Sequence, residues 1–462
     1  MQKKYIGDKA FYRRVLAIAI PIIIQNGITH FVSLLDNIMV GQLGDPQMSG
    51  VSIANQLIMI ANLCMFGATS GAGIFTAQFR GNDDEKGIRY TFRYKFLILL
   101  SIAIASVLFL IPLGQPLIQM FLKGDGSIVD AGMTLGFGEA YLQIMLIGLV
   151  PFAIANIYTS TLREYGETKI PMLAGVFAVL TNLILNYILI FGHFGAPAMG
   201  VEGAAIATVV SRFVELGFLA IWTHTHPEKY PFIKGAYKSL YVPGKLVWNI
   251  SKRGLPLVLN ETLWAIGIAW MNQSYSICGL DVVNAVNITS TINNLASVVT
   301  MAMGATIGII MGHNIGSGME KEEIFDINRK LLAFCVAMGF VFAGFLAAFS
   351  GLFPKLYNTS ESIRRTATGL ILILAAIKPL HTYTYCAYFS IRAGGNTWTT
   401  FLYDGGFMMA VSVPVAFALT RFTSLTIFPV YILSQGVDLI KAFLGFCVLR
   451  KGNWANRITE KT

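Results

Sequence analysis

A single carboxylate stands in the first long apolar stretch of the chain. Asp36 lies in the segment FVSLLDNIMVGQLG, and the residues from Val15 to Gly44 otherwise carry almost no charge. A charged side chain at membrane depth costs at least ~2.5–3.5 kcal/mol, so a carboxylate retained there indicates a function. Such a group can exchange a proton for another cation, and this chemistry could couple an ion gradient to the movement of a substrate.

Further polar residues accompany Asp36 at helical spacing. Four polar residues after Gln25 recur at i, i+4, i+7 and i+11, a spacing that places their side chains on one face of a helix. Such a polar face cannot contact lipid, so it must contact other helices or water. Alternatively, Gln25, Thr29 and Ser33 only form hydrogen bonds between helices. The residues at this spacing are Asn26, His30, Ser33 and Asn37, with Gln25, Thr29 and Asp36 on the adjoining stripe.

Two other apolar stretches of the N-terminal half contain amides and a hydroxyl. Asn182 and Asn186 stand one helical turn apart in TNLILNYILI, next to Thr181. Thr208 stands in GAAIATVVSR, whose small residues allow helices to approach closely. Together with Asp36, these side chains could form an oxygen-rich pocket.

The C-terminal half has ionisable residues of its own within apolar stretches. Glu261 follows Pro256 by five residues, in a helix whose backbone the proline loosens. Lys378 and His381 stand in AAIKPLHTYTYC, also beside a proline, and could pair with Glu261. Two interpretations stay open, because such a pair can be static structure or can take part in ion coupling or substrate binding. Charges nearer the ends of their stretches are expected to snorkel or to form local structural pairs; these are Arg212, Glu215, Asp438 and Lys441.

The elements that carry these residues are predicted to be membrane-spanning helices. The chain has 462 residues, of which 55% are apolar and 13% charged, whereas soluble proteins are about 45–50% apolar. A helix needs about 20 mainly apolar residues to cross a bilayer, and the runs lack the alternation of a β-barrel. Twelve stretches qualify, at residues 15–38, 51–77, 96–116, 133–155, 172–191, 203–222, 254–276, 286–312, 331–353, 366–390, 399–420 and 427–448.

The net charge of +10 reports topology rather than a polyanionic partner. Most of the 34 Lys and Arg residues fall in the two termini and in the loops after even-numbered spans. This asymmetry places both termini in the cytoplasm, and we expect no nucleic-acid partner. The five cysteines are scattered without ligand-like spacing, so neither a metal site nor a disulfide framework is indicated. The basic N-terminus leads into further spans, which predicts an uncleaved first helix.

The chain repeats itself at an offset of 235 residues, as between Pro21 and Pro256 and between Gly81 and Gly316. An even number of spans in each half gives the two copies the same orientation, related by an axis along the membrane normal. We therefore expect an N-terminal lobe over 1–222, a cytoplasmic linker over 223–253 and a C-terminal lobe over 254–462. Such an arrangement places a substrate cavity between the halves and permits alternating access, which favours a transporter.

Several motifs together resemble those of the multidrug and toxic compound extrusion (MATE) family. They are IPIIIQN followed by LLDNIMVGQLGD, then AQFRGND, LREYGETKIP, TNLILNYILI and GVEGAAIATVVSR. The resemblance covers essentially the whole chain. It implies an all-α protein whose twelve transmembrane helices form two six-helix bundles arranged in a V. It also implies a secondary active antiporter that exports cationic or amphipathic organic compounds in exchange for protons or sodium ions.

The resemblance further implies an ion site in the N-terminal lobe, where sodium is one candidate. Asn186 replaces an acid of the family pattern, which weakens a sodium site and leaves Asp36 as the only acid. In the C-terminal lobe, Glu261 resembles one carboxylate of the sodium-coupled branch, but His381 stands in place of the other. We therefore expect a proton as the coupling ion, with no cofactor and no firm metal site. The residues carried over to the N-terminal site are Asp36, Asn182, Asn186 and Thr208.

Two other functions remain as alternatives. A lipid-linked oligosaccharide flippase of the same superfamily would have a more cationic cavity with several intramembrane arginines, whereas the spans hold chiefly Lys378 and Arg212. A membrane-embedded transferase would need paired acidic metal motifs or a His-centred nucleophile, and neither is found, so we expect no enzyme. We further expect a monomer in the lipid bilayer of a prokaryotic inner membrane, with small organic cations or amphipathic drugs as partners.

Overall fold

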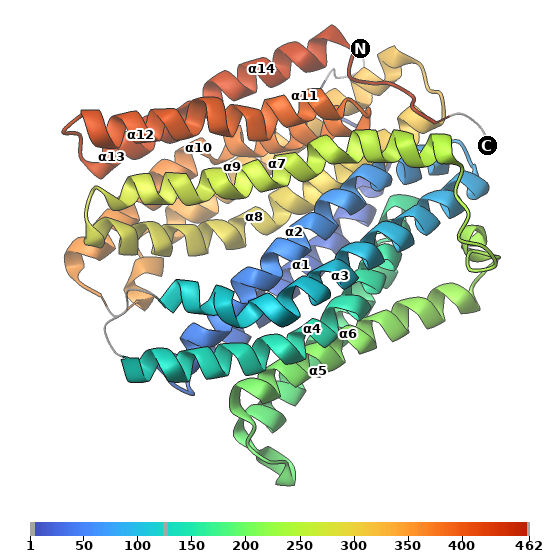
Figure 1. Cartoon of the computed structure of the whole chain (residues 1–462). Helices are drawn as coiled ribbons and strands as arrows, with labels where there is room; N and C mark the ends of the chain where they lie inside the picture. The colour runs from blue at the N-terminus through green and yellow to red at the C-terminus, as the bar shows by residue number, and fades with distance from the viewer. Residues whose placement is uncertain (1–4, 123–127, 358, 460–462) are drawn as a thin grey trace. The chain divides into compact units, whose positions relative to one another are not determined.

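The protein is built from helices in the part of the chain that the structure describes. A computed structural model describes residues 5–122, 128–357 and 359–459 (Figure 1). Short 3-10 turns connect some of the helices, at His193–Gly195, Pro231–Ile233 and Phe353–Leu356. The helices are α1 (Lys9–Gly41), α2 (Asp45–Gly81), α3 (Glu85–Leu122), α4 (Ile128–Tyr165), α5 (Lys169–Phe191), α6 (Gly200–Thr225), α7 (Gly244–Ser276), α8 (Leu280–Gly316), α9 (Lys321–Phe349), α10 (Glu361–Ala393), α11 (Thr397–Phe401), α12 (Val413–Phe422), α13 (Ile427–Gly436) and α14 (Asp438–Lys451).

The prediction of twelve membrane-spanning segments is confirmed for the described residues. Most segments are single helices, while α11 and α12 share the segment Thr397–Phe422, and α13 and α14 share Ile427–Lys451. Several helices extend well beyond their apolar stretches. The helix α3 begins at Glu85, whereas the apolar stretch that predicts it begins at residue 96. Polar and charged residues at the ends of the spans therefore belong to the helices rather than to loops.

Contacts between helices divide the chain into two compact units, which are described separately. The N-terminal unit consists of Ile24–Thr76 and Glu85–Trp248. The C-terminal unit consists of the chain up to Ile23, Ala77–Asp84 and the chain from Asn249 onwards. The boundary in α1 falls shortly after Pro21, and the boundary in α2 falls near its C-terminal end.

In the N-terminal unit, α6 packs against both α4 and α5, and α3 packs against α4 (Figure 1). The contact between α5 and α6 is close because Gly203 has no side chain, and a Cβ there would meet the backbone of Leu189 at 2.7 Å. A buried hydrogen bond of 2.9 Å between the hydroxyls of Thr76 and Thr91 joins α2 to α3. The close approach of α5 and α6 brings the polar residues of these two helices together.

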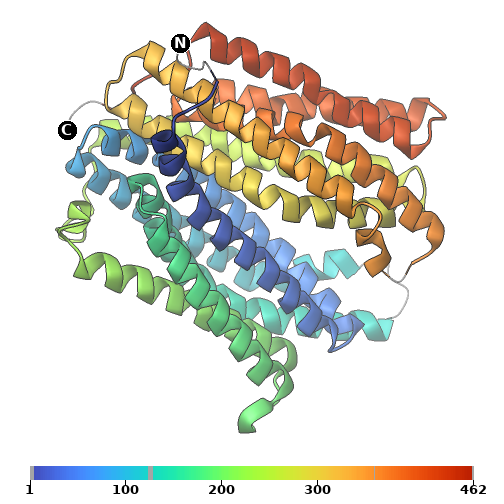
Figure 2. The ribbon, with the colours of Figure 1, turned by 180° about the vertical axis from the view of Figure 1, so that it is seen from behind.

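The helix α10 is central to the C-terminal unit, where it packs against α8, α9 and α14 (Figure 2). Its buried face contributes Cys386 and Ile391 to an apolar core that Leu331 and Cys335 of α9 and Ile307 of α8 complete. The polar side chains of α10 therefore meet different neighbouring helices according to the face on which they lie.

The C-terminal ends of α2 and α8 approach each other closely within the C-terminal unit. A Cβ at Gly81 would overlap the carbonyl group of His313, and a Cβ at Gly316 would overlap the backbone of Gln78. Gln78 is fully buried, and its side chain also bonds to the backbone of the segment that follows α14. These two glycines are therefore required by the close contact between the helices.

The segment between α6 and α7 is bound to α3. Arg93 donates three hydrogen bonds to the carbonyl oxygens of Ala236, Gly235 and Tyr241, at 2.8, 2.8 and 3.1 Å. Arg89, one turn earlier, donates to two more carbonyls of the segment. The polar stretch expected to be a linker therefore holds a fixed position on the N-terminal unit over most of its length.

Replacing Arg93 by Ala is expected to free this segment from α3. The substitution removes three charge-assisted hydrogen bonds, each worth about 1.5–3 kcal/mol. Limited trypsin digestion of the purified protein measures the effect, because the segment contains lysines, and cleavage there should become at least several-fold faster. Arg365→Ala is the matched control, since Arg365 is exposed and pairs with Glu361. Equal cleavage rates in both variants would contradict the prediction.

Candidate functional site

Asp36, Asn182, Asn186 and Thr208 lie together in the N-terminal unit. The helix α1 carries Asp36, α5 carries both asparagines one turn apart, and α6 carries Thr208. The side chains of Asn182 and Asn186 are buried, with 5% and 1% of their surface exposed, because this stripe of α5 faces other helices. The structure thus brings together the residues that the sequence places in the N-terminal ion site.

Hydrogen bonds connect the side chains of this cluster. Asn186 donates from Nδ2 to Asp36 Oδ1 at 2.6 Å. The Asn182 amide, with its nitrogen turned toward the carboxylate, lies 2.9 Å from Oδ1 and 3.1 Å from Oδ2 of Asp36. In the same orientation, its oxygen lies 3.2 Å from Thr208 Oγ1. The hydrogen-bond partners of the carboxylate are therefore neutral amides of one neighbouring helix.

The cluster combines one acid with neutral oxygen and nitrogen atoms. Arg212, one turn after Thr208 on α6, acts on Asp36 through its charge without a direct contact. The oxygen Oδ1 of Asn186 is buried and has no hydrogen-bond partner among the described residues. One proton or one monovalent cation is enough to neutralise the Asp36 carboxylate. The cluster can therefore exist in a charged and in a neutral state.

Only part of the polar face of α1 forms contacts between helices. Gln25 is buried and accepts a hydrogen bond of 2.5 Å from Arg163 Nη2 on α4, as expected of a residue that joins helices. Thr29 bonds to its own helix, donating to the carbonyl oxygen of Gln25 at 2.9 Å. His30 and Ser33 are exposed. The middle of this face is therefore open around the position of Asp36.

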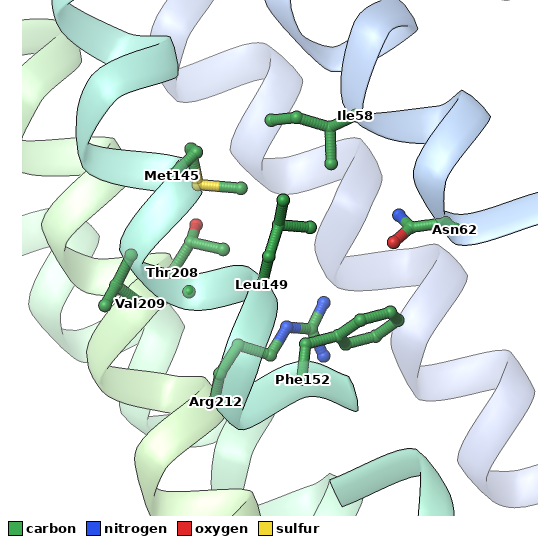
Figure 3. Close-up of a pocket in the computed structure, with 9 residues that line it drawn as sticks. Ile58, Asn62, Met145, Leu149, Phe152, Thr208, Val209 and Arg212 are labelled. Atoms are coloured by element: carbon green, nitrogen blue, oxygen red, sulfur yellow. The ribbon is translucent and has the colours of Figure 1, made fainter. Parts of the chain in front are cut away.

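A small pocket lies beside the cluster, between α2, α4 and α6 of the N-terminal unit (Figure 3). Its volume is about 40 Å³. Thr208 forms part of its wall and also contacts Asn182, so the pocket and the Asp36 cluster share a residue. Side chains that line the pocket include Ile58, Asn62, Leu149, Phe152, Thr208 and Arg212.

Lys378 does not pair with Glu261 in the described part of the chain, contrary to the pairing that their sequence positions suggest. Its side chain is 3% exposed and donates from Nζ to Asn293 Oδ1 at 3.1 Å and to Ser297 Oγ at 2.9 Å. Both partners lie on α8, because this face of α10 packs against α8. Lys378 is therefore a buried cation held by neutral oxygens.

His381 and Glu261 also have separate partners. His381 Nε2 lies 3.4 Å from Asp438 Oδ2 on α14. Glu261 accepts a hydrogen bond of 3.4 Å from the hydroxyl of Tyr388. Lys378 and His381 do not pair with Glu261 because successive turns of α10 contact different helices. The helix that each turn contacts determines the partner of its side chain. The C-terminal candidates therefore lie on two helices, Lys378 and His381 on α10 and Glu261 on α7, and these contacts do not join them.

Asp404 is a partly buried acid that the sequence patterns did not single out. Lys441 donates to its Oδ1 at 2.7 Å, so this lysine bonds to another helical segment rather than within its own. Asn260 of α7 donates to Asp404 Oδ2 at 3.0 Å and accepts a hydrogen bond of 2.8 Å from the backbone of Gly405. Asp404 stands in a π-helical turn, Leu402–Gly406, and such turns are rare and frequent at functional sites. The sequence feature that could have indicated Asp404 is a single acid in the apolar stretch 399–420, the same feature that indicates Asp36.

A second buried ion pair was also missed. Lys95 of α3 is fully buried and donates to Glu164 of α4 at 2.5 Å. Its ammonium group also bonds to the hydroxyls of Ser160 and Thr161, at 3.1 and 3.2 Å. Lys95 lies directly before the apolar stretch 96–116, and Glu164 lies nine residues after the stretch 133–155, so both fall outside the segments from which the helices are predicted.

Comparisons with known proteins agree with this fold. The family model MatE matches residues 21–188. A probable multidrug resistance protein NorM of Thermotoga maritima is 24% identical over 457 residues, covering 96% of this chain and 93% of that protein. The multidrug resistance protein PmpM of Pseudomonas aeruginosa is 24% identical over 426 residues, covering 89% and 84%.

Solved structures share the fold over nearly the whole chain. A crystal structure of a MATE protein in the bent conformation has a TM-score of 0.84 at 18% identity and covers 96% of both chains. An outward-facing structure of a multidrug resistance MATE family transporter has a TM-score of 0.83 at 18% identity and covers 97% of this chain and 98% of the other. The twelve apolar helices and the nearly full-length relatives make this chain a multi-pass membrane protein, its fold is that of the solved MATE structures, and its residues 21–188 are similar to the MatE family.

Proposed function

We propose that this protein is a multidrug efflux transporter, a secondary active antiporter that exports cationic or amphipathic organic compounds in exchange for protons. The observation that carries the proposal is the Asp36 carboxylate, which lies in a membrane-spanning helix with amides as its hydrogen-bond partners. A carboxylate at that depth is costly unless it is used. The names of the multidrug resistance relatives in Thermotoga maritima and Pseudomonas aeruginosa support the same class of substrate.

Exchange at Asp36 would couple the ion to the movement of helices. When a proton neutralises the carboxylate, its hydrogen bonds with Asn182 and Asn186 weaken, and α1 is free to pack differently. An ion shifts such an equilibrium only by binding one packing more tightly than the other. Pro21 lies inside α1 and removes a backbone hydrogen bond, so the helix can bend there.

The donor set around Asp36 favours a proton over sodium. Two amide nitrogens face the carboxylate, whereas a sodium ion would need the amide oxygens to turn toward it. No second acid lies in the cluster, so a bound sodium ion would be neutralised by one carboxylate alone. Glu261, Lys378 and His381 are candidates for further coupling or substrate contacts in the C-terminal unit, since each is an ionisable side chain in a spanning helix.

The remaining features follow from the charge distribution and the family. We place the protein in the inner membrane of a prokaryotic cell with both termini in the cytoplasm, because Lys and Arg gather in the termini and the loops on that side. We take it to work as a monomer and as a transporter rather than an enzyme, with no cofactor besides the coupling ion.

Efflux from proteoliposomes tests the proposal. The purified protein is reconstituted, the vesicles are loaded with ethidium as a fluorescent organic cation, and either a pH gradient or a sodium gradient is imposed. We expect the pH gradient alone to drive ethidium movement above the rate in protein-free vesicles. Movement driven by sodium alone would replace the proton with sodium as the coupling ion. No movement under either gradient would contradict the proposal.

A further inference from the structure

Lys378 is a buried lysine of a membrane-spanning helix that has no acidic partner among the described residues. Its side chain is 3% exposed, and its printed neighbours at hydrogen-bond distance are neutral oxygens. Taking a charge out of water is costly, so buried charges are usually paired with an opposite charge. Lys441 of the same unit follows this rule, because its ammonium group bonds to Asp404. A positive charge on Lys378 therefore lacks the compensation that Lys441 has.

The hydrogen bonds around Lys378 suit a neutral amine. An ammonium group has three N–H donors, whereas the neutral amine has two. The described residues supply two acceptors, Asn293 Oδ1 at 3.1 Å and Ser297 Oγ at 2.9 Å. Ser297 donates its own hydrogen to Asn293 Oδ1 at 3.4 Å, so its lone pairs stay available to the lysine. The neutral amine uses both of its donors here, while the ammonium group has one donor left over.

The charged groups on and around α10 do not compensate Lys378. On α10 itself, His381 follows three residues later, and its Nε2 lies 3.4 Å from Asp438 of α14, which is therefore already engaged. The helix α9 meets this turn at Gly339, where a Cβ would lie 2.8 Å from the Cα of Pro379. Other ionisable side chains of the packed helices are Asp281 and His313 in the first and last turns of α8, the charged residues of Lys321–Lys330 and Cys335 in α9, Tyr431 of α13, and Lys441 of α14, which bonds to Asp404.

A polar and largely exposed face of α8 lies beside this lysine. Its side chains recur at i, i+3, i+7 and i+10, a spacing that places them on one face of a helix. Asn293 and Ser297 are half-buried and adjoin this face. Polar side chains exposed at membrane depth face water rather than lipid, so a proton can reach Lys378 through one layer of polar side chains. The residues of this face are Asn284, Asn287, Thr291 and Asn294.

We propose that Lys378 is a second proton-binding residue of the transport cycle. It takes up one proton at Nζ and changes from an amine to an ammonium group, while Asp36 takes up another and changes from a carboxylate to a carboxylic acid. The inference rests on the proton-coupled efflux proposed above and specifies how many protons are exchanged for each organic cation. Two protons then enter for each monovalent cation that leaves, so each cycle carries one net positive charge inward. Because like charges repel strongly in a low-dielectric interior, protonation of Lys378 also favours release of a cationic compound.

A membrane potential tests this number of protons. Proteoliposomes with the wild type have equal pH and equal ethidium concentration on both sides, and a potassium gradient with valinomycin makes their interior negative. One net charge per cycle responds to this potential, so a roughly tenfold potassium gradient should raise the external ethidium concentration to at most about tenfold the internal one. Passive leakage of a cation runs in the opposite direction. Absence of outward movement would show one-to-one exchange and overturn the proposal.

Two variants assign the response to Lys378. Lys378→Met removes the titrating amine, and Lys378→Arg keeps a charge that cannot be lost in a protein. Both should abolish the outward movement driven by the potential, while efflux under a pH gradient continues at a reduced rate. Outward movement that persists in either variant would overturn the proposal, because a static cation or another group would then be sufficient. Lys355→Met is the matched control, since Lys355 is an exposed lysine of the same unit, and it should respond like the wild type.

Proton release in detergent tests the proposal without a variant. Saturating ethidium is added to the purified wild type in a weakly buffered solution that contains a pH indicator. We expect more than one proton to be released for each ethidium bound, because both Asp36 and Lys378 give up a proton when the cation binds. Release of one proton or fewer would be accounted for by Asp36 alone and would overturn the proposal.

The same vesicles separate this inference from the proposed function. If a pH gradient drives ethidium movement and the potential alone does not, the efflux function stands and the second proton at Lys378 is rejected. If neither the pH gradient nor the potential drives ethidium movement, the efflux function is rejected, and the inference that rests on it is rejected as well.

Discussion

Asp36→Asn is expected to reduce gradient-driven efflux at least about tenfold while the protein remains folded. Asn has nearly the same shape as Asp but can neither take up nor release a proton. A pH gradient can shift the equilibrium between two packings only through a group that binds the proton more tightly in one of them, and Asn at this position provides no such group; each 1.4 kcal/mol of lost coupling corresponds to about tenfold. The measurement is ethidium efflux from proteoliposomes under an imposed pH gradient.

Asp45→Asn is the matched control for this experiment. The substitution is the same, Asp to Asn, and Asp45 belongs to the same unit. Asp45 is exposed, however, and lies in the first turn of α2. This variant should transport at the wild-type rate. The size-exclusion profile of Asp36→Asn should match the wild type and its unfolding midpoint should not fall, because Asn keeps the shape of Asp and an oxygen that accepts the hydrogen bond from Asn186. Unimpaired efflux in Asp36→Asn would show that the carboxylate is structural.

Lys95→Met is expected to lower the stability of the protein by about 3–5 kcal/mol, the usual cost of removing one partner of a buried ion pair. Lys95 is fully buried, and its ammonium bonds to Glu164, Ser160 and Thr161. The substitution leaves the carboxylate of Glu164 without its lysine in a protein interior. The measurement is thermal unfolding in detergent, where the midpoint should fall by several degrees.

Two comparisons identify the origin of this loss. The double variant Lys95→Met with Glu164→Gln removes both charges and should regain most of the lost stability. Lys234→Met breaks an exposed pair with Glu228 and should have an effect below about 1 kcal/mol. A double variant as unstable as Lys95→Met would place the loss in packing rather than in charge.

The membrane-spanning architecture could be predicted because it depends on local composition. Each span needs only length and apolarity, and the Asp36 cluster needed only the one-turn spacing of Asn182 and Asn186 and a hydroxyl on the next helix. The partners of Lys378 and His381 could not be predicted in this way. They follow from which helices surround α10, and that packing depends on the whole unit.

The position of charged residues at the ends of the spans also depends on contacts between distant parts of the chain, so composition alone does not predict it. The first turns of α3 are polar, so Lys95 fell outside the apolar stretch that defines the span. Those turns are polar because Arg89 and Arg93 bind the segment that precedes α7, a contact between residues far apart in the sequence. Asp404 was within reach of the sequence, since the criterion that singles out Asp36 applies equally to a lone acid in residues 399–420.

The contact between the ends of α2 and α8 has the reciprocity of a homodimer interface. At the offset of 235 residues, Gln78 corresponds to His313 and Gly81 to Gly316. Gly81 approaches His313 while Gly316 approaches Gln78, so each half offers the other the same two positions. Such an isologous contact arises when two identical subunits meet across a twofold axis. The internal repeat of the sequence is therefore also a symmetry of this helix contact, in which each glycine admits the backbone at the position equivalent to its own partner.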